Sequence, residues 1–92
     1  MSHVIEGKIL VALPTTNGQT KTEKDWEKKE FVLETSERFP IRIRFSMTSF
    51  DGPVEDAPSV DEKVRVRFTV EAREISGRWY NDVKAYQIEK LG

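Results

Sequence analysis

Basic and aromatic side chains recur at alternate positions in three segments of this 92-residue chain. Cations along one face of a strand can hold successive phosphates. Aromatic rings beside them can stack on bases, each stack contributing about 1–3 kcal/mol. The residues with this pattern, our candidate contacts for single-stranded nucleic acid, are Trp26, Lys28, Arg42, Arg44, Arg78, Tyr80, Lys84 and Tyr86. No base-edge code is evident among them, which favours binding with little sequence preference, and the choice between DNA and RNA stays open.

Some of these residues also have a purely structural interpretation. Arginines on the solvent-exposed face of a strand usually contact water and no ligand. A tryptophan that begins a strand, such as Trp26, can cap the end of a barrel. Trp79 and Tyr80 are adjacent, so they point to opposite faces. Parity with Val83 predicts Trp79 in the core and Tyr80 on the ligand side. Tyr86 belongs to the core instead if a β-bulge switches the parity of its strand.

Catalytic and metal-binding chemistry find little support in the sequence. There is no cysteine, and His3, near the terminus, is the only histidine, which argues against a Ser-His-Asp relay and a thiolate or histidine metal site. No glycine-rich phosphate loop is present. The acids of residues 51–62 do not match the spacing of an EF-hand loop, so we interpret them as a solvated loop. We therefore expect a binding protein with no cofactor and no metal, not an enzyme.

Alternation of apolar and polar residues with a period of two predicts an all-β chain. Within this pattern Gly7 indicates a bend or a close backbone approach, and Asn17-Gly18 is interpreted as a turn. Residues 50–62 are predicted to be a loop with room for a short helical turn. The strands that we expect cover residues 4–13, 26–35, 41–47, 64 to the Ser76-Gly77 turn, and 78–89.

The parity of each strand predicts which side chains face the core. In the second strand these are Phe31 and Leu33, and in the last strand Val83 and Ala85. In the third strand the expected inward residues are Ile41, Ile43, Phe45 and Met47, with Ser46 facing outward. In the fourth strand they are Val64, Val66, Phe68, Val70 and Ala72.

Five strands in this order predict one domain over residues 1–92, a five-stranded Greek-key barrel of the oligonucleotide/oligosaccharide-binding (OB) class. Closing the sheet removes the edges that five open strands would expose. An SH3-like barrel is the competing fold, but its strands are usually shorter. In an OB barrel the ligand crosses strands two and three between the first loop and the last hairpin. The first loop would add Lys21 and Lys24 to the candidate surface.

Three segments resemble a known family: Gly7-Lys8-Ile9, residues 26–35 with their Trp-x-Lys-Lys-x-Phe run, and residues 77–86 with Gly-Arg-Trp-Tyr-x-Asp. The family consists of small bacterial and bacteriophage domains of unknown function, regarded as OB folds similar to single-stranded DNA-binding proteins. The resemblance implies the barrel and, by analogy, single-stranded DNA as the partner. Residues 47–62 fall outside the resemblance.

Charge and hydropathy set the wider expectations. The net charge of −1 excludes a strongly basic, histone-like protein but allows a local basic face. No apolar run is long enough for a membrane span, so we expect a soluble cytoplasmic protein without a membrane partner.

A dimer or tetramer is expected, with the outward residues Arg65, Arg67 and Thr69 as one contact. The alternative function is a protein-interaction or assembly module on the same barrel, with Trp26 and Tyr80 as interface anchors.

Overall fold

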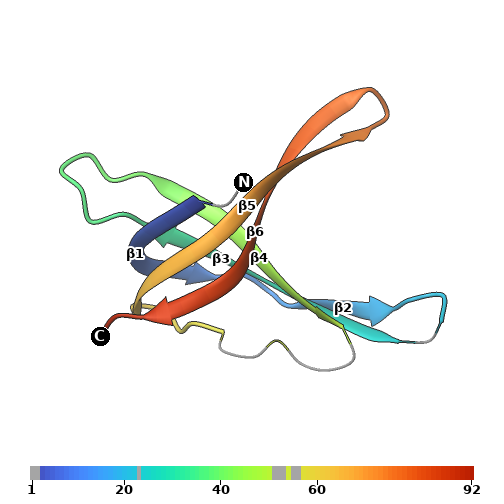
Figure 1. Cartoon of the computed structure of the whole chain (residues 1–92), viewed down its shortest axis with the longest axis horizontal. Coiled ribbons are helices and arrows are strands. Elements are labelled where there is room, and N and C mark those ends of the chain that lie inside the picture. The colour runs from blue at the N-terminus through green and yellow to red at the C-terminus, as the bar shows by residue number, and fades with distance from the viewer. Residues whose placement is uncertain (1–2, 23, 51–53, 55–56) are drawn as a thin grey trace.

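A computed structural model describes residues 3–22, 24–50, 54 and 57–92 of the chain. Six strands account for most of these residues, and none of the described residues is helical. The strands are β1 (His3–Ala12), β2 (Thr16–Gln19), β3 (Asp25–Glu34), β4 (Arg42–Phe50), β5 (Lys63–Ile75) and β6 (Arg78–Lys90) (Figure 1). Three acids of the expected acidic loop, Asp51, Glu55 and Asp56, lie outside the described residues.

The sheet closes on itself in the strand order β1-β5-β6-β4-β3-β2, because β1 also pairs with β3. The first half of β1 pairs with β5 and the second half with β3, with a shift of register between Ile9 and Val11. Gly7 lies where β1 passes from one partner to the other. A Cβ at this position would collide with the carbonyl oxygen of Glu34 and lie 2.7 Å from Leu33 Cδ2. The predicted close backbone approach at Gly7 is confirmed, and so is the closed all-β topology of an OB fold.

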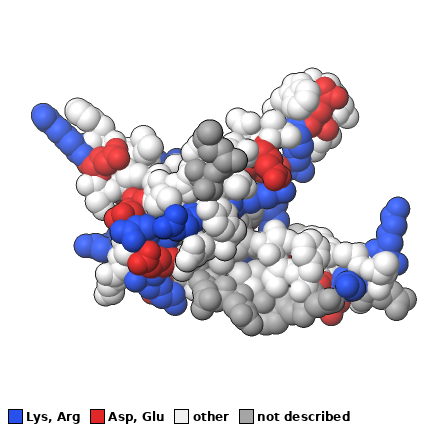
Figure 2. Space-filling model, in the orientation of Figure 1, with Lys and Arg blue, Asp and Glu red and all other residues white. Residues whose placement is uncertain are grey.

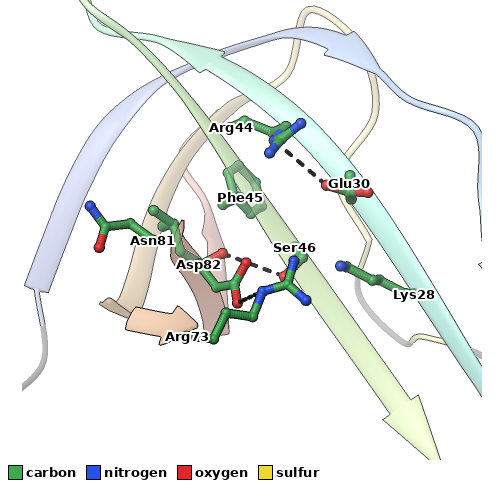
Figure 3. A pocket seen from close by; sticks show the side chains of 9 residues that line it. Lys28, Glu30, Arg44, Phe45, Ser46, Arg73, Asn81 and Asp82 are labelled. Atoms are coloured by element: carbon green, nitrogen blue, oxygen red, sulfur yellow. Dashed lines mark hydrogen bonds and ion pairs between the residues drawn. The ribbon is translucent and has the colours of Figure 1, made fainter. Parts of the chain in front are cut away.

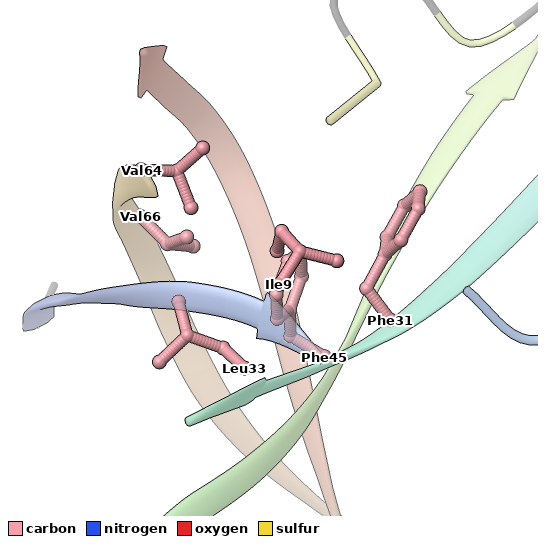
Figure 4. Close-up of a cluster of buried hydrophobic side chains, with 6 residues drawn as sticks. All are labelled: Ile9, Phe31, Leu33, Phe45, Val64 and Val66. Carbon is pink, nitrogen blue, oxygen red and sulfur yellow. The ribbon is translucent and has the colours of Figure 1, made fainter. Parts of the chain in front are cut away.

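The centre of the closed sheet holds a small apolar core (Figure 4). Its buried side chains are Ile9, Phe31, Leu33, Phe45, Val64 and Val66. The rings of Phe31 and Phe45, on neighbouring strands, lie 5.6 Å apart. All of them except Ile9, whose strand carried no such prediction, have the parity predicted to face the core. The alternating pattern therefore predicted the centre of the barrel correctly.

The inward predictions fail near the strand ends. Ile41 is 53% exposed, Val70 is 46% exposed, and Trp79 is 68% exposed. Ala72 is exposed as well. For β5 and β6 the reason is that Phe68 is the last residue of β5 that pairs with a described residue of β1, and the two strands continue beyond the barrel as a hairpin (Figure 1). Trp79 points to the same face of its strand as the core residues, but it lies on the hairpin beyond the barrel, where no core side chain covers it.

Two features of β6 decide how the barrel closes. β6 runs parallel to β4 and pairs with it at Ser46, whose hydroxyl donates a 3.4 Å hydrogen bond to the carbonyl oxygen of Val83. Ser46, predicted to face outward, is therefore buried. The register of β5 against β6 shifts so that Tyr86 is skipped in the described pairing, which confirms a bulge in this strand. Ala85 before the bulge and Ile88 after it both pack against the core, whereas Tyr86 stays exposed.

The predicted turn at Asn17-Gly18 is wrong. Both residues lie in β2, a sixth strand in the first loop, and the chain reverses between Gln19 and Asp25. Gly18 pairs with Trp26 of β3, and a Cβ on this glycine would lie 2.9 Å from Trp26 Cζ2. The glycine is required by the indole that lies over it, not by a turn.

Candidate functional site

Two hairpins project from the barrel on either side of the outer face of β3 and β4 (Figure 1). One is formed by β2 and β3. The other, which we call the arm, consists of residues 69–84 of β5 and β6. Between β4 and the arm lies a pocket of about 190 Å³, which we call the groove (Figure 3). Its lining side chains are Lys28, Glu30, Arg44, Phe45, Ser46, Arg73, Asn81, Asp82 and Val83.

The register of the strands brings the charged side chains of the groove together. On β3, Lys28 and Glu30 have the parity opposite to the buried Phe31, so both point outward. On β4, Arg44 lies opposite Val32, which follows Lys28 and Glu30 on the same outer face of β3. The arm adds Arg73 and Asp82, which line the groove together with these residues (Figure 3).

Most cations of the groove and the arm are held by carboxylates. Arg44 Nε lies 3.7 Å from Glu30 Oε2, and Arg73 Nε lies 2.8 Å from Asp82 Oδ2. On the arm, Lys84 Nζ lies 2.8 Å from Glu71 Oε2. The hydrogen bond to this carboxylate and its charge raise the pKa of Lys84, which therefore stays protonated at neutral pH.

The groove therefore mixes both signs of charge. Blue and red side chains lie interspersed over the face shown in Figure 2 rather than forming one basic stripe. Lys28 differs from the other cations, since no carboxylate among the described residues forms an ion pair with it. It is the cation that a phosphate can reach without displacing a competing group.

Four of the eight predicted contacts lie in or beside the groove. Lys28 and Arg44 line it directly. Lys84 pairs with Ser46, which also lines it. Tyr80 is 43% exposed and lies opposite Arg73 in the hairpin, so its ring lies on the side of the arm that carries the groove cations.

The other four predicted contacts lie away from the groove. Arg42 is at the start of β4, with its Nε 3.0 Å from Glu34 Oε2, and Arg78 is at the tip of the arm. Trp26 is half-buried near the start of β3. Tyr86 is 56% exposed at the bulge of β6. These residues surround the groove at a distance instead of lining it.

Three kinds of residue at this surface are absent from the predicted contacts. The carboxylates of Glu30 and Asp82 share the outward parity of Lys28 and Tyr80, so the signal was present, but only basic and aromatic side chains were selected. Arg73 was missed because nothing in the alternation shows that the arm and β4 line one pocket. Phe50 lies opposite Trp26 and is 62% exposed, but the predicted strand ended at Met47.

Comparison with known proteins identifies the fold and a family. The family model described as "Domain of unknown function (DUF3127)" matches residues 4–89. The N-terminal domain of PriB from Thermoanaerobacter tencongensis, described as dimeric, superposes with a TM-score of 0.59 at 14% identity, over 99% of this chain and 96% of that chain. A small single-stranded DNA-binding protein from Streptomyces coelicolor superposes with a TM-score of 0.54 at 9% identity, over 99% and 94%. No curated protein matches. In the part of the chain that the structure describes, no helix is long and apolar enough to cross a membrane.

Proposed function

The chain belongs to this DUF3127 family of domains of unknown function, and we propose that it binds single-stranded DNA with little sequence preference. The observation that supports the proposal is the groove, in which the outer face of an OB fold and a projecting hairpin bring together Lys28, Arg44 and Arg73. Structural similarity to a single-stranded DNA-binding protein supports the same proposal. We propose a binding role only and assign no residue to catalysis.

Phosphate capture begins at Lys28, which has no ion pair among the described residues to give up. Arg44 and Arg73 then exchange the carboxylates of Glu30 and Asp82 for phosphate oxygens, which accept the same N–H donors. Three neutralised phosphates on a single strand give a log–log dependence of affinity on salt of about −2. A shallow slope of this size matches a groove with few net positive charges.

Aromatic side chains on the arm and at the far end of the outer face of β3 and β4 supply the stacking surfaces. Tyr80 offers a ring on the arm, and Phe50 offers one at the end of β4. Trp26, whose indole lies beside Gly18 and whose partner in β4 is Phe50, adds a half-buried ring next to Phe50. Every base has a π-face, so stacking on these rings is tolerant of sequence.

The test is the fluorescence anisotropy of a labelled oligo-dT titrated with protein at two salt concentrations. The variant Lys28→Glu replaces attraction by repulsion at one phosphate, and we expect its affinity to fall about tenfold or more. The matched control is Lys63→Glu, which changes the net charge equally at the exposed start of β5, away from the groove. Equal binding by both variants would contradict the groove as the site. An oligo-U of the same length tests the preference for DNA.

A second candidate function is protein interaction, which one observation favours. Trp79 is 68% exposed on the side of the arm opposite Tyr80, where it contributes nothing to the groove. Exposed tryptophans are frequent anchors of protein interfaces. If the folded protein leaves the anisotropy of oligo-dT unchanged at low salt, DNA binding is wrong and this candidate takes its place.

A further inference from the structure

The arm has a strand edge that none of the described residues covers. Among the described residues, 69–75 of β5 pair with β6 on one side only, since the last described pairing of β1 with β5 joins His3 to Phe68. No other described strand approaches this edge, and the arm stands clear of the barrel (Figure 1). An exposed strand edge of seven residues is a template for pairing with another strand.

The arm also lacks the packing that would stabilise it alone. A two-stranded hairpin without a covering layer is marginally stable in water. Val70, Ile75 and Trp79 are each 46% exposed or more, so the apolar side chains of the arm gain little burial within one chain. A further strand beside β5 would add hydrogen bonds and cross-strand contacts to the same ribbon.

We propose that two copies of this chain associate by antiparallel pairing of their β5 edges, with a two-fold axis at Ala72. In this register Thr69 of one copy lies opposite Ile75 of the other, so the pairing covers the whole free edge. It ends at Phe68, where β1 occupies the edge of the second copy, and at Ser76, where the hairpin turns. The joined arms form a four-stranded sheet in the order β6-β5-β5-β6.

The charges of β5 select the same register. With Ala72 on the axis, Glu71 of each copy lies opposite Arg73 of the other, which gives two opposite-charge pairs across the edge. A slip of two residues in one direction places Glu71 opposite Glu71, and a slip in the other direction places Arg73 opposite Arg73. Opposite charges directly across a strand pair stabilise it and like charges destabilise it. The free length and the charge pattern therefore agree on one pairing.

Both charged side chains are free to take a second partner. Glu71 is 59% exposed and Arg73 57% exposed, although each already forms an ion pair within its own chain. A carboxylate has about four lone-pair sites and a guanidinium has five N–H donors, so neither is saturated. The pairing would link Lys84, Glu71, Arg73 of the second copy and Asp82 of the second copy in a row of alternating charge.

The association would also align the two grooves. Residues directly opposite each other in a sheet point to the same face. The side of each arm that carries Arg73 and Tyr80 would therefore lie on one face of the shared sheet, and the grooves of both copies would open to that face. The pairing itself needs no nucleic acid, so it stands or falls independently of the proposed function.

The experiment is sedimentation velocity over a concentration series without DNA. For Glu71→Arg, two attractive cross-strand pairs become repulsive, and we expect the dimer Kd to rise about tenfold or more. The charge-swapped double variant Glu71→Arg with Arg73→Glu restores both pairs between copies, so its Kd should return to within about threefold of the original. Within one chain the swap places an arginine beside Lys84 and a glutamate beside Asp82. A purely intrachain role would therefore not be rescued.

A second pair of variants tests the position of the axis. Ala72 is exposed in the single chain, so its replacement does not disturb the core. Ala72→Lys places two like charges opposite each other on the axis and should abolish the dimer, whereas the control Ala72→Val should keep it. A monomeric protein at every concentration, a dimer that Ala72→Lys leaves intact, or failure of the swap to rescue Glu71→Arg would each overturn the proposal.

Discussion

Removing the carboxylates of the groove should strengthen DNA binding. Glu30 holds Arg44 at 3.7 Å and Asp82 holds Arg73 at 2.8 Å, so each carboxylate occupies a position that a phosphate oxygen must take. The substitutions Glu30→Gln and Asp82→Asn keep the shape of each side chain and remove its charge. They leave the guanidinium groups available to the ligand.

The size of the gain follows from the exposure of these pairs. Both arginines are more than half exposed, so water and salt screen the ion pair with the carboxylate and the repulsion between the carboxylate and a phosphate, and the two effects together cost about 1 kcal/mol. Neutralising one carboxylate should therefore raise the affinity about fivefold. The double variant should gain between about five- and 25-fold, because both residues line one groove and need not act independently.

The assay is the anisotropy titration with labelled oligo-dT, supported by urea unfolding to show that each variant is folded. The control Glu89→Gln breaks an ion pair of the same type, with Arg65 Nη1 at 2.8 Å, outside the groove. It should leave the affinity unchanged. The gain at Glu30 and Asp82 should shrink as salt rises, since screening weakens both terms. Unchanged or weaker binding by the folded double variant would refute the idea that these carboxylates compete with phosphate.

Two further changes test the fold and the stacking surface. Gly7→Ala should lower the free energy of unfolding, measured in urea, by about 1–3 kcal/mol, because the new Cβ meets the backbone oxygen of Glu34 and the side chain of Leu33. A stability equal to that of the original protein would show that β1 can shift away from this contact. Phe50→Ala should weaken oligo-dT binding by about 1–3 kcal/mol with little loss of stability. The control Trp79→Ala, on the side of the arm opposite Tyr80, should change neither the affinity nor the stability. Equal affinities of the two variants would remove Phe50 from the stacking surface.

The centre of the fold could be predicted from the sequence because burial and strand parity coincide there. Phe31 and Leu33 occupy alternate positions of one strand, Phe45 lies between two polar residues of the next, and each of the three is buried. The same rule fails at Trp79, since parity tells which face a side chain occupies but not whether another layer covers that face. Gly18 shows a second limit. An Asn-Gly pair is a strong local turn signal, yet the indole of Trp26 on the neighbouring strand determines its conformation.

The candidate site shows why a list of cations is a weak predictor of a binding surface. Arg42 and Arg44 were selected by their outward positions on one strand, but Glu34 and Glu30 reach them from the adjacent strand. Ion pairing in a sheet depends on register, which one strand does not reveal. Lys28 has the same parity as its acidic neighbour Glu30 and still forms no ion pair with any described residue. A charge that is unpaired in the folded chain is the better predictor of ligand contact, and Lys28→Glu is for that reason the decisive substitution in the groove.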